Sequence, residues 1–178
     1  MKIKILHLFP DLLNLYGDSG NIESLRKRLA WRGIDAEVRE YKADDTDFDL
    51  SDVDILFLGG GTEREERIAV SKLMAEKEKI FDYVNSGKSL FAVCGGFRML
   101  GKYSETDENK QEELGILDFK GVVATNLHGP LLPKNPKLCD YILENALKIK
   151  YSEFEGLSPL SDDLENKANN LIVERYKN

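Results

Sequence analysis

The sequence predicts an α/β fold, a doubly wound and mostly parallel sheet with helices on both faces. Apolar runs of strand length alternate with amphipathic stretches of helix length, and two runs, 53–59 and 89–93, are apolar almost throughout. Strands of this kind are typical of the centre of a parallel sheet that is covered by helices on each side. Because no linker or repeat divides the 178 residues, we expect one domain over residues 1–178.

The first half of the chain follows a strand–helix–strand order. Residues 2–9 are strand-like, and residues 21–33 form a helical pattern that ends at Gly33, a suitable C-terminal cap. Residues 34–41 alternate as a half-buried strand does, and residues 63–87 predict one long amphipathic helix. One helical face of the first helix holds Ile22, Leu25, Leu29 and Trp31.

Two further helices are expected near the C-terminus, at 135–151 and at 158–178, the second with Ser161 and Asp162 as candidate starting caps. Each helix would either cover a sheet edge or dock a partner protein. In a doubly wound sheet the ligand site lies beyond the carboxyl ends of the strands. The functional residues are therefore sought directly after the strands.

Composition excludes several classes of function. The net charge of −7 argues against a general nucleic-acid footprint, which needs an excess of Lys and Arg. No apolar run is long enough to span a bilayer, so we expect a cytoplasmic protein. The two cysteines, Cys94 and Cys139, are too few for a disulfide framework and lack metal-ligand spacing, so we expect no metal and no cofactor.

Cys94 is the candidate nucleophile. It ends the apolar run 89–93 and is followed by Gly95 and Gly96, as a nucleophile at a tight strand-to-helix turn requires. The N-terminus of the following helix would favour the thiolate. The alternative is a small buried core residue, and for Cys139, inside a helical pattern, that alternative is much stronger.

His128 is the better candidate for the base that a cysteine nucleophile needs. It follows the strand-like "GVVATNL" at the start of a loop, whereas His7 lies inside the first strand pattern and is expected to be structural. The alternative for His128 is a polar residue that anchors the loop "HGPLLPKNP".

Four motifs together resemble a known family. They are "LYGDSGN" (15–21), "GGGTERE" (59–65), "AVCGGFRMLG" (92–101) and "LHGPLLPKNP" (127–136). In this order they resemble the class I glutamine amidotransferases of the cobyric acid synthase type, and within them the GatD-like glutaminase subunits of lipid II isoglutaminyl synthases. The resemblance implies release of ammonia from L-glutamine for a Mur-ligase-like amidating subunit. That partner would form a heterodimer with this chain and amidate D-glutamate of the peptidoglycan stem peptide.

The resemblance also assigns site residues. Cys94 matches the nucleophile and His128 the general base, while Gly60 and Gly61 match the oxyanion loop. The Gly95 amide would complete the oxyanion hole, and Arg98 falls beside the expected substrate pocket. We expect these six residues to form one site.

The third member of the triad differs from the common pattern. Many class I amidotransferases have an acidic residue two places after the histidine, where this chain has Pro130. In the GatD-like branch the partner ligase is expected to supply that carboxylate. Asp18 and the acids of "TEREE" are expected to be solvated caps.

The chain departs from the family in three places. Thr62 and Arg98 stand where glutamine is common, and only 34 positions separate Cys94 from His128 (128 − 94). Family members have more chain there, including an arginine that holds the substrate. Either the segment is truly shortened, or two pieces of a longer chain are joined. We expect the second, with a backbone break between Leu100 and Gly121 and the junction at Asp118 to Phe119.

Two other functions remain open on the sequence. A glutaminase for corrinoid amidation would use the same Cys94 and His128. A non-catalytic regulatory or binding subunit that kept the fold would tolerate Thr62, Arg98 and the short middle segment. Hydrolysis of glutamine would distinguish either enzyme from the binding subunit.

Overall fold

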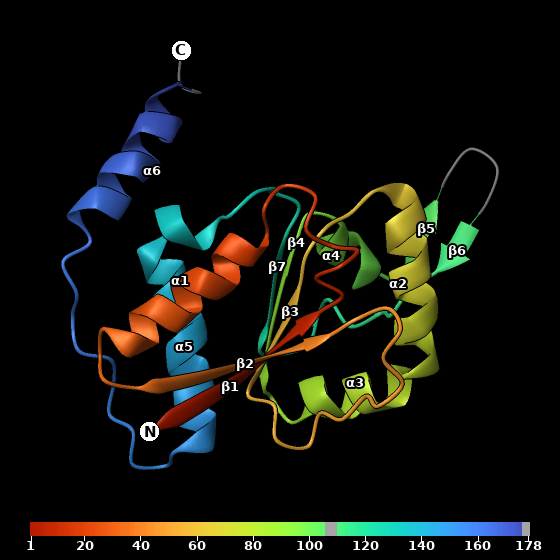
Figure 1. Ribbon diagram of the computed structural model, residues 1–178, viewed down its shortest axis with the longest axis horizontal. Coiled ribbons are helices and arrows are strands. Elements are labelled where there is room, and N and C mark those ends of the chain that lie inside the picture. Colours follow the sequence, from red (N-terminus) through yellow and green to blue (C-terminus); the bar gives the residue numbers. More distant parts are fainter. Residues whose placement is uncertain (106–109, 176–178) are drawn as a thin grey trace.

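The computed structural model describes residues 1–105 and 110–175. Its main sheet has five strands in the order β2-β1-β3-β4-β7, and all neighbours pair in parallel (Figure 1). The strands are β1 (Lys2–Leu8), β2 (Asp35–Tyr41), β3 (Ile55–Leu58), β4 (Ser89–Val93) and β7 (Val122–Thr125). The predicted fold class is confirmed.

The chain reverses its direction across the sheet at β1. From β1 it crosses to β2 on one side, and later strands continue from β3 on the other side. Ligand crevices of open α/β sheets form at such a switch point, beyond the carboxyl ends of the strands. The loops after β1, β3, β4 and β7 meet at this edge, so it is where a site is expected.

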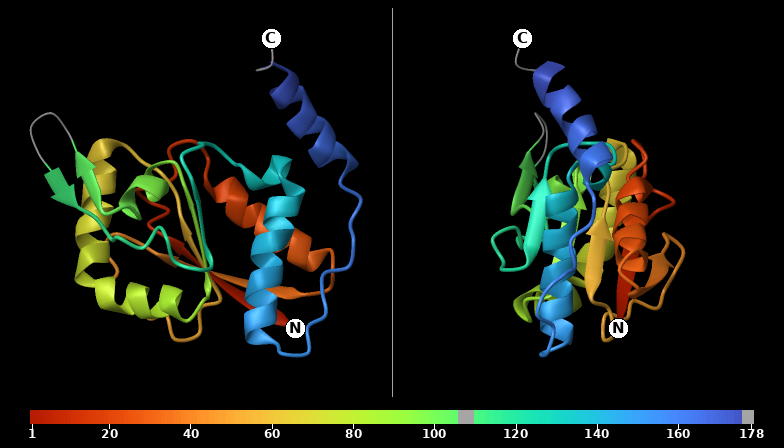
Figure 2. Two further views of the ribbon diagram at one scale, coloured as in Figure 1. Left: turned by 180° about the vertical axis from the view of Figure 1, so that it is seen from behind. Right: turned by 90° about the vertical axis from the view of Figure 1, so that its left-hand side faces the viewer.

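Helices cover both faces of the sheet. Figures 1 and 2 show α1 and α5 together on one face and α2 and α3 together on the other. The helices are α1 (Ser19–Ala30), α2 (Glu63–Ala75), α3 (Lys77–Asn85), α4 (Gly95–Met99), the 3-10 helix η1 (Leu132–Lys134), α5 (Pro136–Lys150) and α6 (Asp163–Arg175). A two-stranded antiparallel ribbon of β5 (Tyr103–Glu105) and β6 (Lys110–Glu112) lies beside α2.

The central strands divide the core into two layers. In β3, Leu56 and Leu58 belong to the cluster under α2 and α3, whereas Ile55 and Phe57 belong to the cluster under α1 and α5. All four residues are buried, because both faces of a central parallel strand are covered. This explains why the sequence of β3 shows no polar alternation.

An ion network joins α1 to α5. The Arg28 guanidinium, 3% exposed, donates to Asp140 on α5 at 2.7 Å and to Asp162 at 2.7 Å, and Arg32 also donates to Asp140. Beyond Asp162 the chain continues into α6, which has no buried residue and extends away from the body (Figure 2). Asn169 of α6 donates to the Lys134 carbonyl of η1 at 2.8 Å.

Several local expectations were wrong. The helix predicted over 63–87 is two helices, α2 and α3, separated at Glu76, whose φ of −108° and ψ of 15° are not helical. Trp31 is 59% exposed, because α1 ends before it, while Ile22, Leu25 and Leu29 are buried as expected.

The short connection before β7 is an unbroken turn. The Phe119 N–H donates to the Ile116 carbonyl at 3.3 Å, and the Val122 N–H donates to the Phe119 carbonyl at 3.1 Å. The predicted break between Asp118 and Phe119 is therefore not observed. No helix within residues 1–105 and 110–175 has the length and apolar character needed to cross a bilayer.

Candidate active site

Cys94 stands at a strained turn between β4 and α4. Its φ is +54° and its ψ −120°, a backbone conformation that a side-chain-bearing residue rarely adopts. The Cys94 N–H donates to two carbonyls of the β7 end, Thr125 at 3.0 Å and Leu127 at 3.1 Å. A strained strand-to-helix turn that carries a nucleophile is the geometry of a nucleophile elbow.

Glycines allow three segments to meet at this turn. A Cβ on Gly60, in the loop after β3, would lie 2.7 Å from the Cys94 sulfur, and a Cβ on Gly96 would lie 2.5 Å from the Leu58 carbonyl. Cys94 itself is only 6% exposed. The predicted need for small neighbours is met by Gly60 beside the sulfur and by Gly96 against the end of β3.

The surroundings of Cys94 raise the pKa of its thiol more than they lower it. Burial raises the pKa of the Cys94 thiol, and the Gly95 N–H and the Arg98 guanidinium offset this only in part. The carboxylates of Asp18 and Glu66 raise the pKa further. The first N–H of α4 thus lowers the pKa of the thiol as expected, but burial outweighs it, so the thiol needs a base.

His128 lies at the corresponding end of the neighbouring strand. It follows Leu127, whose carbonyl accepts the Cys94 N–H, so its backbone is tied to the cysteine turn. The exposed imidazole stacks on Tyr16 from the loop after β1, with 5.1 Å between ring centroids. His7, in contrast, is buried within β1, 3% exposed, as expected of a structural residue.

Asp18 is not the solvated cap that the sequence predicted. It is fully buried, and its Oδ2 accepts the Gly60 N–H at 3.0 Å, while Oδ1 has no hydrogen-bond partner among the described residues. Burial raises the pKa of the Asp18 carboxyl, and the Gly60 hydrogen bond and the charge of His128 lower it. The carboxylate therefore lies between the glycine loop and the histidine loop.

Asn21, three residues later, is a site residue that the sequence reasoning missed. Its Oδ1 accepts the N–H groups of Leu131 and Leu132 at 2.8 and 2.9 Å, and the side chain is fully buried. Asp18 and Asn21 thus tie the loop of Gly60 and the loop of His128 to the start of α1. The signal in the sequence is the motif "LYGDSGN", whose last residue is Asn21 in the first turn of α1.

The family of this chain follows from comparison with known proteins. CobB/CobQ-like glutamine amidotransferase domains match residues 4–128, which include the glycine loop, the cysteine turn and the histidine. The chain belongs to this amidotransferase family. It is accordingly a glutamine amidotransferase, an enzyme that hydrolyses the side-chain amide of glutamine.

The relatives of this amidotransferase include two GatD subunits of lipid II isoglutaminyl synthase (glutamine-hydrolyzing). The protein from Staphylococcus aureus (strain N315) is 29% identical over an alignment of 236 positions. The alignment covers 98% of this chain and 96% of that protein. The protein from Streptococcus pneumoniae is 36% identical over 126 residues, 70% of this chain and 48% of that protein. A cobyrinate a,c-diamide synthase from Archaeoglobus fulgidus is 37% identical over 75 residues, 42% of this chain and 16% of that protein.

The amidotransferase chain is shorter than its staphylococcal relative. The alignment spans 236 positions and this chain has 178 residues, so at least 58 positions (236 − 178) have no counterpart here.

Thr62 of the amidotransferase, one departure from the family pattern, is a helix cap. Its hydroxyl accepts the Glu65 N–H at 3.4 Å, and the Glu65 carboxylate accepts the Thr62 N–H at 2.8 Å. This reciprocal pair is a capping box, which stabilises the start of α2. Thr62 therefore has a structural role that needs no ligand.

Arg98, the other departure, pairs with Glu66. One guanidinium nitrogen, Nη2, donates to both oxygens of Glu66, at 2.8 and 2.6 Å. The Arg98 side chain is half exposed, whereas the whole of Glu66 is only 8% exposed. Glu66, expected to be a solvated acid, is thus a buried carboxylate beside the cysteine turn.

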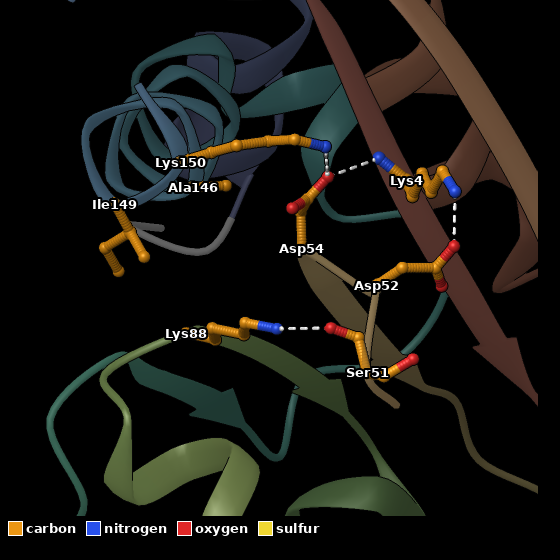
Figure 3. A pocket seen from close by; sticks show the side chains of 8 residues that line it. All are labelled: Lys4, Ser51, Asp52, Asp54, Lys88, Ala146, Ile149 and Lys150. Atoms are coloured by element: carbon orange, nitrogen blue, oxygen red, sulfur yellow. Dashed lines mark hydrogen bonds and ion pairs between the residues drawn. The ribbon is translucent and has the colours of Figure 1, made fainter. Parts of the chain in front are cut away.

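A pocket lies at the opposite edge of the sheet, at the N-terminal ends of the strands (Figure 3). The Lys150 ammonium pairs with Asp54 at 2.6 Å, and the Lys4 ammonium pairs with Asp52. Lys88 donates to the Ser51 carbonyl at 3.4 Å. The ammonium groups of these three lysines are already bound by protein oxygens. We therefore interpret the residues around this pocket as a structural cluster that joins the N-terminal ends of the strands.

Proposed function

We propose that this chain is the glutaminase subunit of a two-protein amidating enzyme, with Cys94 as nucleophile and His128 as general base. The acceptor would be D-glutamate in the peptidoglycan stem peptide, activated with ATP by a Mur-ligase-like partner in the cytoplasm. The names of the GatD relatives support this acceptor over a corrinoid. The staphylococcal relative is also matched over 96% of its own length, whereas the corrinoid synthases are matched over 16% to 30% of theirs. The observation that carries the mechanism is the strained Cys94 turn bonded to the residue before His128.

The proposed reaction has two halves. His128 takes the thiol proton of Cys94, and the sulfur forms a bond to the side-chain carbonyl carbon of glutamine. His128 then gives the proton to the nitrogen, the C–N bond breaks, and ammonia leaves a γ-glutamyl thioester on Cys94. Water, deprotonated by His128, attacks the thioester carbon, and glutamate leaves as the thiol regains its proton.

Backbone amides would stabilise the oxyanion that forms in each half. The Gly60 N–H, one of the expected oxyanion donors, already donates to Asp18 at 3.0 Å. Gly60 instead contributes by having no side chain, which leaves room beside the Cys94 sulfur. The amides of Gly61 and Gly95 are the remaining candidates. Arg98, half exposed beside the turn, carries the charge that suits the carboxylate of the substrate.

The mechanism predicts that Cys94→Ala abolishes ammonia release from glutamine, by more than about 10³-fold, because the covalent step is lost. The measurement is ammonia or glutamate production by the purified chain with its partner present. Cys139→Ala is the matched control, because Cys139 is buried in the α5 layer, and it should keep its activity.

Two results would contradict the proposal. Residual hydrolysis by Cys94→Ala at the rate of the Cys139→Ala chain would remove Cys94 from the mechanism. Absence of hydrolysis in the wild-type chain with every candidate partner would favour the non-catalytic subunit instead.

A further inference from the structure

The buried carboxylate of Glu66 lies inside the cysteine turn. Its Oε1 is the nearest acceptor to the Gly61 N–H, at 3.4 Å, and a Cβ on Gly95 would fall only 1.9 Å from the same oxygen. Oε1 therefore lies between the glycine loop after β3 and the first residue of α4. These are the two segments that border the Cys94 sulfur.

Glu66 Oε1 occupies the position in which the side-chain carbonyl oxygen of a reacting glutamine would need to bind. The amides that can serve an oxyanion there are those of Gly61 and Gly95, because Asp18 already holds the Gly60 amide. Glu66 accepts from the Gly61 amide and leaves no room beside the Cα of Gly95. A fixed negative charge there opposes a second negative charge, since like charges a few ångströms apart in a protein repel strongly.

Arg98 explains how a carboxylate is kept in this position. Its guanidinium contributes two short hydrogen bonds to Glu66, and a buried charge is tolerable only when it is paired in this way. The two ends of the pair differ in exposure, 50% for the Arg98 side chain and 10% for that of Glu66. Arg98 thus reaches in from solvent, and outward rotation of the paired Glu66 and Arg98 side chains together would vacate the space over Gly95.

We propose that Glu66 controls access of the glutamine carbonyl oxygen to the oxyanion pocket. Its carboxylate stands where that oxygen must bind, and glutamine reacts only after the carboxylate has turned outward together with Arg98. This inference rests on the proposed attack of Cys94 on glutamine. Glu66 acts by occupying the pocket, so its effect falls on substrate binding more than on the chemical step.

The first test is the kinetics of Glu66→Ala and Glu66→Gln. Emptying the pocket removes a competing occupant, so kcat/KM for glutamine should rise by about tenfold or more in Glu66→Ala, mostly through a lower KM. Glu66→Gln should rise less, because its amide is neutral but still fills the space. Glu63→Gln is the matched control, because Glu63 lies in the same first turn of α2 with its side chain 71% exposed, and it should leave both constants unchanged.

The second test labels Cys94 without turnover. A glutamine-analogue diazoketone needs its ketone oxygen in the pocket, whereas iodoacetamide alkylates the sulfur by displacement and does not. The ratio of the two labelling rates should rise about tenfold in Glu66→Ala over wild type, and thermal melting checks that each variant is folded.

The outcomes separate the two proposals. Labelling of Cys94 by the diazoketone at the same ratio in wild type, Glu66→Ala and Glu66→Gln would overturn the role of Glu66 alone. A lower ratio or a higher KM in Glu66→Ala would also overturn it. Failure of the diazoketone to label Cys94 in any of these chains would overturn the proposed glutaminase mechanism and, with it, the role of Glu66.

Discussion

At the scale of single residues, several ionisable groups of this amidotransferase are buried. His7 in β1 is 3% exposed, contacts Phe57 with 5.1 Å between ring centroids, and leaves Nε2 without a partner among the described residues. Burial lowers the pKa of His7 to about 4, against the weaker opposite effect of Glu40. The folded chain therefore holds this imidazole neutral.

This burial predicts an acid sensitivity. The unfolded chain binds a proton at His7 near its ordinary pKa of 6.5, and the folded chain only near 4, so stability is lost as pH falls from 6.5 to 4. The loss reaches about 3 kcal/mol, taking about 1.4 kcal/mol for each unit of pKa. His7→Phe should remove this part of the pH dependence.

The measurement is the free energy of unfolding in urea at pH 7 and at pH 4.5, for wild type, His7→Phe and His128→Ala. The last variant is the control, because the ring of His128 is exposed. A difference between the two pH values that is the same in all three chains would show that carboxylates alone cause the acid sensitivity.

At the scale of elements, the short helix α4 is fixed against the end of β3. A Cβ on Gly96 would meet the backbone carbonyl of Leu58 at 2.5 Å, which cannot move without shifting a central strand. A Cβ on Gly95 would meet only the end of the Glu66 side chain, which can rotate. Gly96 is therefore constrained by a backbone atom of a central strand, whereas Gly95 is constrained by a side chain.

This difference predicts that Gly96→Ala destabilises the fold by roughly 1–3 kcal/mol, the usual cost of overpacking, and that it also displaces Cys94. Gly95→Ala should cost clearly less stability. Thermal or urea unfolding of both variants measures the difference. Equal losses would mean that α4 adjusts as a unit and that its contact with Leu58 is loose.

At the scale of the whole molecule, the site lies at an edge to which another protein has access. His128 and its neighbour Leu127 are exposed, as are Leu15 and Tyr16 in the facing loop. No hydrogen bond from the His128 imidazole to a carboxylate is found within residues 1–105 and 110–175, although Asp18 lies near enough to interact electrostatically. The imidazole therefore lacks the acceptor that usually fixes its tautomer and orientation.

We expect the amidating partner to raise the glutaminase rate by placing an Asp or Glu beside His128. In the serine protease that defines this arrangement, disabling the orienting carboxylate lowers kcat about 10⁴-fold, which sets the upper limit of the effect. The measurement compares the rates of the chain alone and with the ligase, in wild type and in Asp18→Asn. Equal rates with and without the ligase, together with a large loss in Asp18→Asn, would assign the orienting role to Asp18 instead.

The sequence by itself determined the five strands of the main sheet, most of the helices and the turn at Cys94. These features have local causes: an apolar run buried on both faces, an amphipathic period, and glycines that must follow a residue with positive φ. The family could be assigned for the same reason, because its motifs are short and continuous. The helix break at Glu76 was missed, since the apolar period runs on across it.

Only the tertiary structure decided what surrounds the sulfur. Asp18 and Glu66 were expected near the surface, since charged residues are mostly solvated, and both are buried. Their burial depends on how the loops after β1 and β3 pack against α4, and no local pattern encodes the approach of segments that are far apart in the chain. The same packing turns Glu66 toward Gly61 and Arg98 toward Glu66, because a carboxylate removed from water must find donors wherever the fold provides them.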